Sequence, residues 1–135
     1  MQAIPIMSAY VVSKTALIRF SEALALDTVE DGIQVFAIHP GVVRTPMNDY
    51  VCNSPEVEKS APGHQQWFQN LYAQGLDTPI ERPVHLVLRL AAGDADTLSG
   101  RYISVEDDLD ALVKECAGEL AADERMLRVN GVAAV

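Results

Sequence analysis

Apolar side chains recur along the first part of the chain with the spacing of an α-helix. Between residues 10 and 29 these positions are Ala16, Leu17, Phe20, Ala23, Leu24 and Leu26. Such spacing gathers the side chains on one broad face, which a helix in a folded domain buries. Gly32 follows the pattern, and glycine is the usual residue just beyond a helix end. The sequence therefore predicts one long helix over residues 10–29 with a broad buried face.

The pattern changes after Gly32 from that of a helix to that of a strand. Residues 33–40 read IQVFAIHP, an apolar and β-branched run bounded by Gly32 and Pro40. Such a run predicts a buried strand, and a buried strand after a helix is typical of an α/β unit with a parallel sheet. Residues 101–105, RYISV, predict a second short strand.

Between these strands the sequence first predicts a loop and then irregular structure. Residues 40–48 read PGVVRTPMN, and Pro40, Gly41 and Pro46 are typical of a loop. Residues 47–62 are polar and show no regular spacing, so neither a helix nor a strand is expected there.

Three further helices are expected in the rest of the chain. The first covers residues 64–75 and ends at Gly75, and the second covers residues 83–93. Pro83 is expected to open the second helix, because proline is well tolerated near a helix start. The third covers residues 107–120, with acidic residues in its first turn, where the helix dipole favours them.

Two short strands cannot form an independent sheet with both faces hidden. The chain has 135 residues, which is the size of one domain with a substantial core. The sequence therefore indicates a single unit that is part of an α/β domain.

Composition and charge argue against several classes of partner. The formal net charge is −9, whereas binding to nucleic acid or to an anionic membrane surface needs an excess of Lys and Arg. No apolar run approaches the roughly 20 residues that span a bilayer, and the first ten residues lack the features of a signal peptide. We therefore expect a cytoplasmic protein without nucleic-acid or membrane partners.

The cysteines and histidines do not predict a metal site. Neither Cys52 nor Cys116 has a second Cys or His at zinc-ligand spacing, and we expect both to be reduced thiols. The three histidines, His39, His64 and His85, form no metal-ligand spacing either. No metal is expected.

One pair of residues on the first predicted helix suits proton transfer. Tyr10 and Lys14 are four residues apart, which makes them neighbours on a helix surface. A free tyrosine phenol has a pKa near ~10, too high for efficient proton exchange at neutral pH. A nearby ammonium stabilises the phenolate, so a Tyr-x-x-x-Lys pair suits acid–base work on a carbonyl or alcohol. The spacing alone also occurs by chance in ordinary surface pairs.

The loop after the first predicted strand gives this pair more weight. In open α/β sheets, ligands bind beyond the carboxyl ends of the strands, and Pro40, Gly41 and Thr45 follow this strand. Gly41 lets the backbone approach a flat ligand, and Thr45 offers a hydroxyl. A proton-transfer pair followed by a strand with such a loop is a much more specific pattern than either part.

The order of these motifs resembles the carboxyl-terminal half of the short-chain dehydrogenase/reductase family. That family's Tyr-x-x-x-Lys helix, strand and Pro-Gly-x-Val-x-Thr loop are similar to SAYVVSKTALIRFSEALALD and GIQVFAIHPGVVRTPM. Its last helix and final strand are similar to ERPVHLVLRLAAGDADTLSGRYISV, so the resemblance spans residues 8 to about 105. It implies the C-terminal part of a Rossmann-like doubly wound parallel sheet with flanking helices, with residues 1–135 as a partial oxidoreductase domain.

The resemblance implies NAD(P)-dependent interconversion of a carbonyl and an alcohol. Tyr10 would donate a proton to the substrate carbonyl in reduction and accept one in oxidation. Lys14 would favour the ionised phenol and hydrogen-bond the nicotinamide ribose, so both residues would also contact the cofactor. Four residues would line the nicotinamide of NAD or NADP, with the Val43 backbone holding its carboxamide: Pro40, Gly41, Val43 and Thr45.

The resemblance also implies that residues 47–76 form a substrate loop or lid. Candidate walls of the substrate pocket are Met47, Tyr50, Trp67, Phe68 and Tyr72. The alternative that the last three are ordinary core contacts stays equally open. The implied partners are a small-molecule carbonyl or alcohol and, in the full-length form, further copies in a homo-oligomer.

The sequence departs from the family pattern at both ends. It contains neither the family's Gly-rich phosphate loop nor the residue that selects NAD or NADP. The family's catalytic serine would fall ahead of residue 1, and Ser8 and Ser13 are too close to Tyr10 to replace it. The family often ends its last strand with Asp-Gly-Gly, which is absent here, so residues 106–135 are interpreted as an extension.

These departures favour a second hypothesis beside the enzyme. The isolated 135-residue chain is expected to be inactive. It would then serve as a non-catalytic module that associates with a partner subunit through the long first helix or through the last helix and strand.

Overall fold

The computed structural model describes residues 7–117, and the chain divides into two compact units. Unit 1 comprises the described residues up to His39 and from Arg89 onward, and unit 2 comprises Pro40–Leu88. Helix α5 (Glu81–Ala91) runs across this division. Each unit is described by itself. The end of the predicted helix over 107–120 and the later part of the predicted extension over 106–135 lie outside the described residues.

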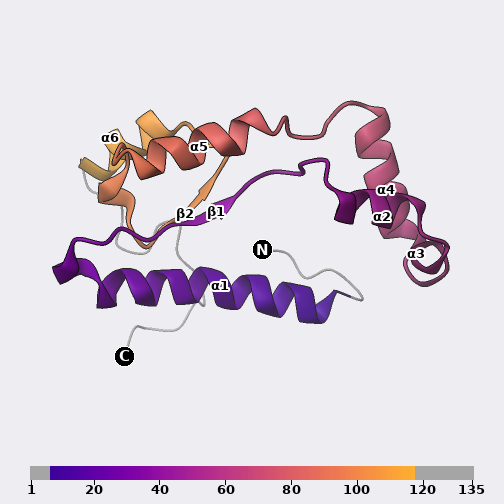
Figure 1. Ribbon diagram of the computed structural model, residues 1–135, viewed down its shortest axis with the longest axis horizontal. Coiled ribbons are helices and arrows are strands. Elements are labelled where there is room, and N and C mark those ends of the chain that lie inside the picture. The colour runs from indigo at the N-terminus through magenta and orange to yellow at the C-terminus, as the bar shows by residue number, and fades with distance from the viewer. Residues whose placement is uncertain (1–6, 118–135) are drawn as a thin grey trace. The chain divides into compact units, whose positions relative to one another are not determined.

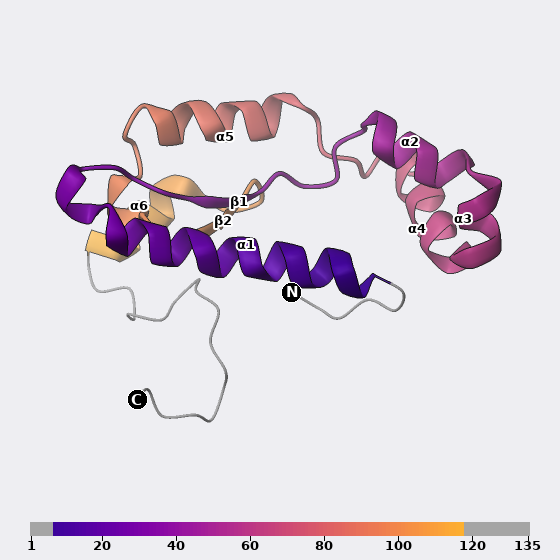
Figure 2. The same ribbon diagram turned by 60° about the horizontal axis from the view of Figure 1, so that its bottom comes forward.

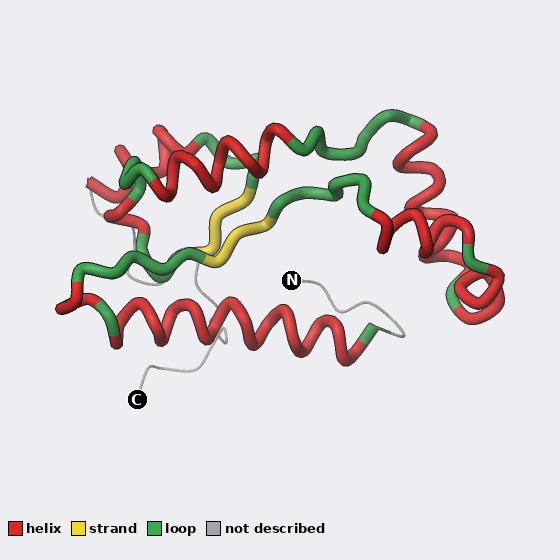
Figure 3. The backbone as a smooth tube through the Cα atoms, in the orientation of Figure 1, coloured by secondary structure: helices red, strands yellow, loops and turns green. Residues whose placement is uncertain are grey.

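Unit 1 is built around a small parallel sheet. Strand β1 (Ala37–His39) pairs with β2 (Tyr102–Ser104), and Ile38 lies opposite Ile103. Figures 1 and 3 show the two strands side by side with the long helix α1 (Ser8–Asp27) running along them. The short 3₁₀ turns η1 (Val29–Asp31) and η2 (Asp96–Leu98) precede the strands, and α6 (Leu109–Ala117) follows them. The described chain is thus mostly helical with a two-stranded parallel sheet, as in the C-terminal region of a Rossmann-like domain.

The first strand is shorter and less buried than the sequence predicts. The expected strand over 33–40 narrows to β1, in which Ala37 is buried but His39 is exposed. Contact with the segment that leads into β2 begins before Ala37, because the Ser99 hydroxyl accepts a hydrogen bond from the Val35 N–H at 3.0 Å. The expectation of a buried strand was wrong, because within residues 7–117 the second edge of β1 has no strand beside it.

Helix α1 confirms the predicted helix but not its predicted buried face. Its buried residues are Ile18, Ser21, Glu22 and Ala25. The predicted core side chains Phe20 and Leu26 are instead 61% and 71% exposed. The physical reason is the narrow sheet, which covers only one stripe of a helix whose apolar positions surround more of its circumference.

A close approach fixes α1 against the segment that leads into β2. Gly100 adopts a left-handed conformation with φ of +82°, and a Cβ there would lie 3.3 Å from the Cβ of Ala25. Glycine removes that crowding, so the helix backbone can approach the turn. The buried Glu22 carboxylate accepts a hydrogen bond from Arg19 at 2.5 Å, which compensates part of its charge.

Unit 2 is helical where the sequence predicts irregular structure. Helices α2 (Pro46–Asn53), α3 (Pro55–Ser60) and α4 (Pro62–Ala73) pack together, as Figure 2 shows. Each begins with a proline in its first turn, a position where the missing N–H costs little.

Two of these helices are also capped by the residue before the proline. The Thr45 hydroxyl accepts from Asn48 N, and the Ser54 hydroxyl accepts from Glu56 N. Such caps satisfy backbone N–H groups that have no partner within the helix. Thr-Pro and Ser-Pro pairs therefore define helix starts here, although the polar residues after them carry no clear apolar period.

The remaining helices follow the predictions with shifted boundaries. Helix α4 begins before the predicted residue 64, and Gly75 closes it in a left-handed conformation. Helix α5 begins at Glu81 and not at Pro83, because a proline in the first turn need not be the first helical residue.

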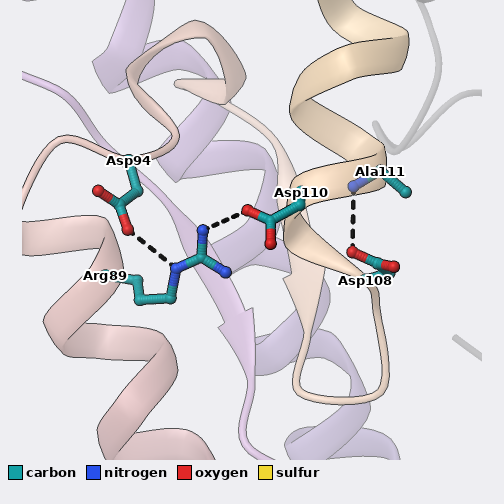
Figure 4. A network of polar contacts seen from close by, with 5 residues as sticks. All are labelled: Arg89, Asp94, Asp108, Asp110 and Ala111. Carbon is teal, nitrogen blue, oxygen red and sulfur yellow. Dashed lines mark hydrogen bonds and ion pairs between the residues drawn. The ribbon is translucent and has the colours of Figure 1, made fainter.

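An ion-pair network links α5 to α6, shown in Figure 4. Arg89 Nε contacts the Asp94 carboxylate at 2.9 Å, and its Nη2 contacts the Asp110 carboxylate at 2.5 Å. Asp108 caps α6 by accepting a hydrogen bond from Ala111 N at 3.0 Å. Hydrogen bonding to Arg89 lowers the pKa of Asp110 below its usual value. The first turn of α6 is therefore fixed by one charged contact and one cap.

Candidate active site

Tyr10 and Lys14 lie on the first two turns of α1, within unit 1. The Lys14 ammonium lies over the tyrosine ring, 5.6 Å from its centroid, and both side chains are exposed. A cation at this distance is attracted by the ring face. The predicted one-turn pairing is therefore present, with the ammonium above the ring in this structure.

Tyr10 lies in the first turn of α1, the helix that runs along the strands of unit 1. The pKa of Tyr102 is raised, mainly by its burial and further by the charges of Asp107 and Tyr10. Helix α1 runs in the opposite direction to the strands, so its first turn lies toward their carboxyl ends (Figures 1 and 2). The Tyr10–Lys14 pair thus lies toward the carboxyl ends of the strands, the edge where ligands bind in open α/β sheets.

The loop of residues 40–45, which we call the nicotinamide loop for its predicted role, lies in unit 2. Gly41 adopts φ of +76°, a conformation that favours glycine. A Cβ at Gly41 would lie 2.1 Å from the Thr78 hydroxyl oxygen, so only glycine fits between the loop and Thr78. Gly41 is therefore required by the loop's own packing, in addition to any ligand contact.

The backbone of Val43 is arranged so that one polar group is engaged and the other is available. Its carbonyl accepts a hydrogen bond from the Asn48 side-chain amide at 2.8 Å. Its N–H donates no hydrogen bond within residues 7–117. The Thr45 hydroxyl accepts from Asn48 N at 3.3 Å and keeps its own proton to donate. The loop can therefore offer one N–H and one O–H to a ligand.

Several residues that the sequence reasoning missed support this loop. The Thr78 N–H donates to the Val42 carbonyl at 2.9 Å, and the Thr78 hydroxyl accepts from Val42 N at 3.0 Å. The Arg44 guanidinium contacts the Asp77 carboxylate at 3.5 Å. No local pattern marked Thr78 or Asp77, because their partners are more than 30 residues away in the chain.

The predicted pocket walls all lie on α2 and α4 of unit 2. Met47, Tyr50 and Trp67 are exposed, and the Tyr50 hydroxyl donates to Glu56 at 2.9 Å. Phe68 is half-buried, with its ring edge-on to Trp67 at 4.9 Å between centroids.

Tyr72 is also half-buried, beneath Arg44. The Arg44 guanidinium lies 4.4 Å from the centre of the Tyr72 ring. Burial is the main cause of the raised pKa of Tyr72, so its phenol stays neutral near pH 7. Phe68 and Tyr72 therefore pack within unit 2, whereas Trp67 is 50% exposed to solvent.

The predicted site residues therefore form two separate groups. Tyr10 and Lys14 belong to unit 1, whereas the nicotinamide loop and the pocket-wall candidates belong to unit 2. Across the described residues, no three His, Cys, Asp or Glu side chains gather in a way that could hold a metal ion. None of the described helices has the length and apolar character needed to cross a membrane.

Comparison with known proteins identifies the family. A family profile described as Enoyl-(Acyl carrier protein) reductase matches residues 1–107. A short chain dehydrogenase/reductase of Claviceps purpurea is 32% identical over 130 residues, which cover 93% of this chain and 37% of that protein. A D-beta-hydroxybutyrate dehydrogenase of Rhizobium meliloti is 29% identical, with 76% of this chain and 41% of the relative covered.

A third relative gives the same picture. The diacetyl reductase [(S)-acetoin forming] of Staphylococcus aureus is 31% identical over 104 residues, which cover 76% of this chain and 40% of the enzyme. The chain thus spans about two-fifths of the length of these relatives. No solved structure matches it significantly. The family profile covers well over half of the sequence, and the chain therefore belongs to the short-chain dehydrogenase/reductase family.

Proposed function

We propose that this chain is the proton-transfer and nicotinamide-binding part of an NAD- or NADP-dependent oxidoreductase that interconverts a small-molecule carbonyl and an alcohol. The observation that carries the proposal is the Tyr10–Lys14 pair, one helical turn apart at the carboxyl-end side of a parallel sheet. Family membership supports it, because the relatives named above are dehydrogenases and reductases.

Tyr10 acts as the acid in reduction and as the base in oxidation. Its phenol donates a proton to the carbonyl oxygen as the alcohol forms, and the phenolate takes that proton back in the reverse direction. Lys14 places its ammonium 5.6 Å from the centroid of the tyrosine ring, where it would also hydrogen-bond the nicotinamide ribose. General acid–base catalysis of this kind contributes about 10²- to 10⁴-fold to a rate.

The nicotinamide loop fits the flat end of the cofactor. The Val43 N–H would hold the carboxamide oxygen, the Thr45 hydroxyl would supply a second donor, and Gly41 would let the backbone approach the ring. Pro40 is the first residue of the same loop. When bound, the nicotinamide supplies or accepts the hydride. Met47, Tyr50 and Trp67 are exposed on α2 and α4, where they can contact a substrate.

The test replaces Tyr10 with Phe in the form of the protein that its source produces, as established by intact mass. Turnover is measured with NADH and NADPH against a panel of small ketones and alcohols. Tyr10→Phe is expected to lose at least 10²-fold in kcat, because the proton donor is removed. Tyr102→Phe is the matched control, since it removes a phenol hydroxyl from the same unit and is expected to keep normal turnover. Retained turnover in Tyr10→Phe contradicts the proposal.

A second candidate function is favoured by the apolar surface of α1. Leu17, Phe20 and Leu26 are exposed on this helix, and a bare apolar patch often marks an interface. On this proposal, the chain is a non-catalytic module that associates with a partner subunit through α1. The two proposals differ in whether Tyr10 matters: association depends on the apolar face and not on the phenol.

A further inference from the structure

The nicotinamide loop is held in place by one residue outside it. Thr78 forms two hydrogen bonds with Val42: its N–H donates to the Val42 carbonyl at 2.9 Å, and its hydroxyl accepts from the Val42 N–H at 3.0 Å. The N–H and the carbonyl of Val42 are therefore both hydrogen-bonded to Thr78, the first to its hydroxyl and the second to its backbone N–H. Such a two-point contact fixes the orientation of the loop as well as its position.

The packing around Thr78 makes this contact rigid. Its side chain is only 8% exposed. The same hydroxyl oxygen packs closely on Gly41, where a Cβ would lie only 2.1 Å from it. The loop therefore has no room to move closer to Thr78, and turning away would break a partly buried hydrogen bond and leave a partly buried polar group unpaired, which is costly.

Neighbouring residues tie the same two segments together. Arg44 contacts the Asp77 carboxylate at 3.5 Å and lies over the Tyr72 ring at 4.4 Å. The Asn48 side chain holds the Val43 carbonyl at 2.8 Å. With Val42 and the Val43 carbonyl both fixed, the direction of the Val43 N–H is set by its neighbours.

We propose that Thr78 is a positioning residue of the nicotinamide loop: its hydroxyl fixes Val42 so that the next N–H, that of Val43, points at the carboxamide. This inference rests on the proposed function of the loop. Thr78 does not touch the reacting atoms and acts through Val42. The hydroxyl is the essential group, because it alone accepts the Val42 N–H.

The experiment uses the 135-residue chain and two readouts. The first is the hydrogen-exchange rate of the Val42 N–H by NMR, which reports the tether without any ligand. The second is saturation transfer to reduced nicotinamide mononucleotide at millimolar concentration, a probe that carries the nicotinamide without the adenosine half. The variants are Thr78→Val, which keeps the shape, and Thr78→Ser, which keeps the hydroxyl. Thr97→Val is the matched control, because Thr97 is exposed and lies in unit 1.

The proposal expects Thr78→Val to accelerate exchange at Val42 by at least tenfold and to weaken saturation transfer by at least threefold. Thr78→Ser restores both, and Thr97→Val changes neither. A role in packing alone would not be rescued by the serine hydroxyl. Far-UV circular dichroism checks folding, and if Thr78→Val unfolds, Thr78→Ala removes the same hydroxyl without filling the site.

Two results overturn the proposal. If exchange at Val42 is unchanged in Thr78→Val, the hydroxyl does not hold the loop. If exchange accelerates while saturation transfer stays at the wild-type level, the tether exists but does not position the ligand. A wild-type chain that shows the tether but no contact with the probe is different: it removes the proposed function of the loop, and the positioning role with it.

Discussion

Leu98 and Ile103 are almost completely buried, and both lie in the short region between the start of η2 and the end of β2. Neighbouring core residues such as Ala95 and Leu112 come from before η2 and from α6. A few side chains from several segments thus form the centre of unit 1. In so small a core, each buried group carries a large share of the stability.

We predict that Leu98→Ala lowers the free energy of unfolding by about 2–5 kcal/mol, because it removes buried methyl groups and leaves a cavity. The measurement is urea denaturation of the chain, followed by circular dichroism. Leu88→Ala is the matched control: Leu88 is 62% exposed whereas Leu98 is 0% exposed, so its change should stay within about 0.5 kcal/mol. Equal losses from the two substitutions would contradict the placement of the core.

Single residues differ in how far the sequence reveals them. The pairing of Tyr10 with Lys14 could be predicted, because helical spacing alone makes them neighbours. The role proposed for Thr78 could not, since Val42 is 36 residues away and no local pattern joins them. Gly41 was predicted as a contact for a flat ligand, and its close packing on Thr78 emerges only from the fold.

At the scale of elements, α6 depends on polar contacts in its first turn. Arg89 contacts both Asp94 and Asp110, and Asp108 caps the helix. The pKa of Asp110 is lowered mainly by the hydrogen bond that Arg89 donates to its carboxylate, and further by the positive charges of Arg89 and Lys114. The folded state therefore prefers the ionised carboxylate more strongly than the unfolded chain does.

This preference predicts an acid-sensitive attachment of α6. Because the folded pKa of Asp110 lies below its unfolded value, its contribution is present at neutral pH and is lost as pH falls through the folded pKa. Hydrogen exchange of the α6 amides, measured from pH 6 downward and corrected for intrinsic rates, should show weaker protection in acid. Asp110→Asn should show the weaker protection already at pH 6.

The matched control for this prediction is Glu115→Gln, an exposed acidic residue on the same helix. It should leave both the protection at pH 6 and its acid dependence unchanged. If Asp110→Asn retains full protection at pH 6, the ion pair with Arg89 does not hold the helix.

Elements with a clear apolar period were predictable, and short capped ones were not. The helix over 10–29 appears as α1, and the strands at 33–40 and 101–105 appear in shortened form. Helices α2 and α3 were missed because their residues are mostly polar and their starts are defined by caps and prolines. Local hydrogen bonds, and not burial, set those boundaries.

At the scale of the whole molecule, α1 has more apolar surface than the described residues cover. The sequence pattern predicts that Leu17, Phe20 and Leu26 are buried, whereas all three are exposed in the structure. An amphipathic helix with a bare face gains free energy from any surface that covers it. This property bears on the second candidate function.

We predict that the isolated 135-residue chain self-associates through α1 at micromolar concentration. Phe20→Lys should weaken the association at least tenfold, because it places a charge on the apolar face. Sedimentation velocity over a concentration series measures the effect. Val29→Lys is the control, since Val29 is also exposed but lies in η1. A wild-type chain that stays monomeric throughout the series would contradict the prediction.

The two hydrogen bonds between Val42 and Thr78 also bring together the ends of a long segment, residues 43–77, which contains α2, α3 and α4. The entropy of closing such a segment changes slowly with its length, by about 0.6 kcal/mol for each doubling. Helices between these two ends can therefore be lengthened, shortened or exchanged with little change in the free energy of bringing the ends together. Such a layout lets the helices between these two ends diversify while the loop that contains Val42 keeps its form.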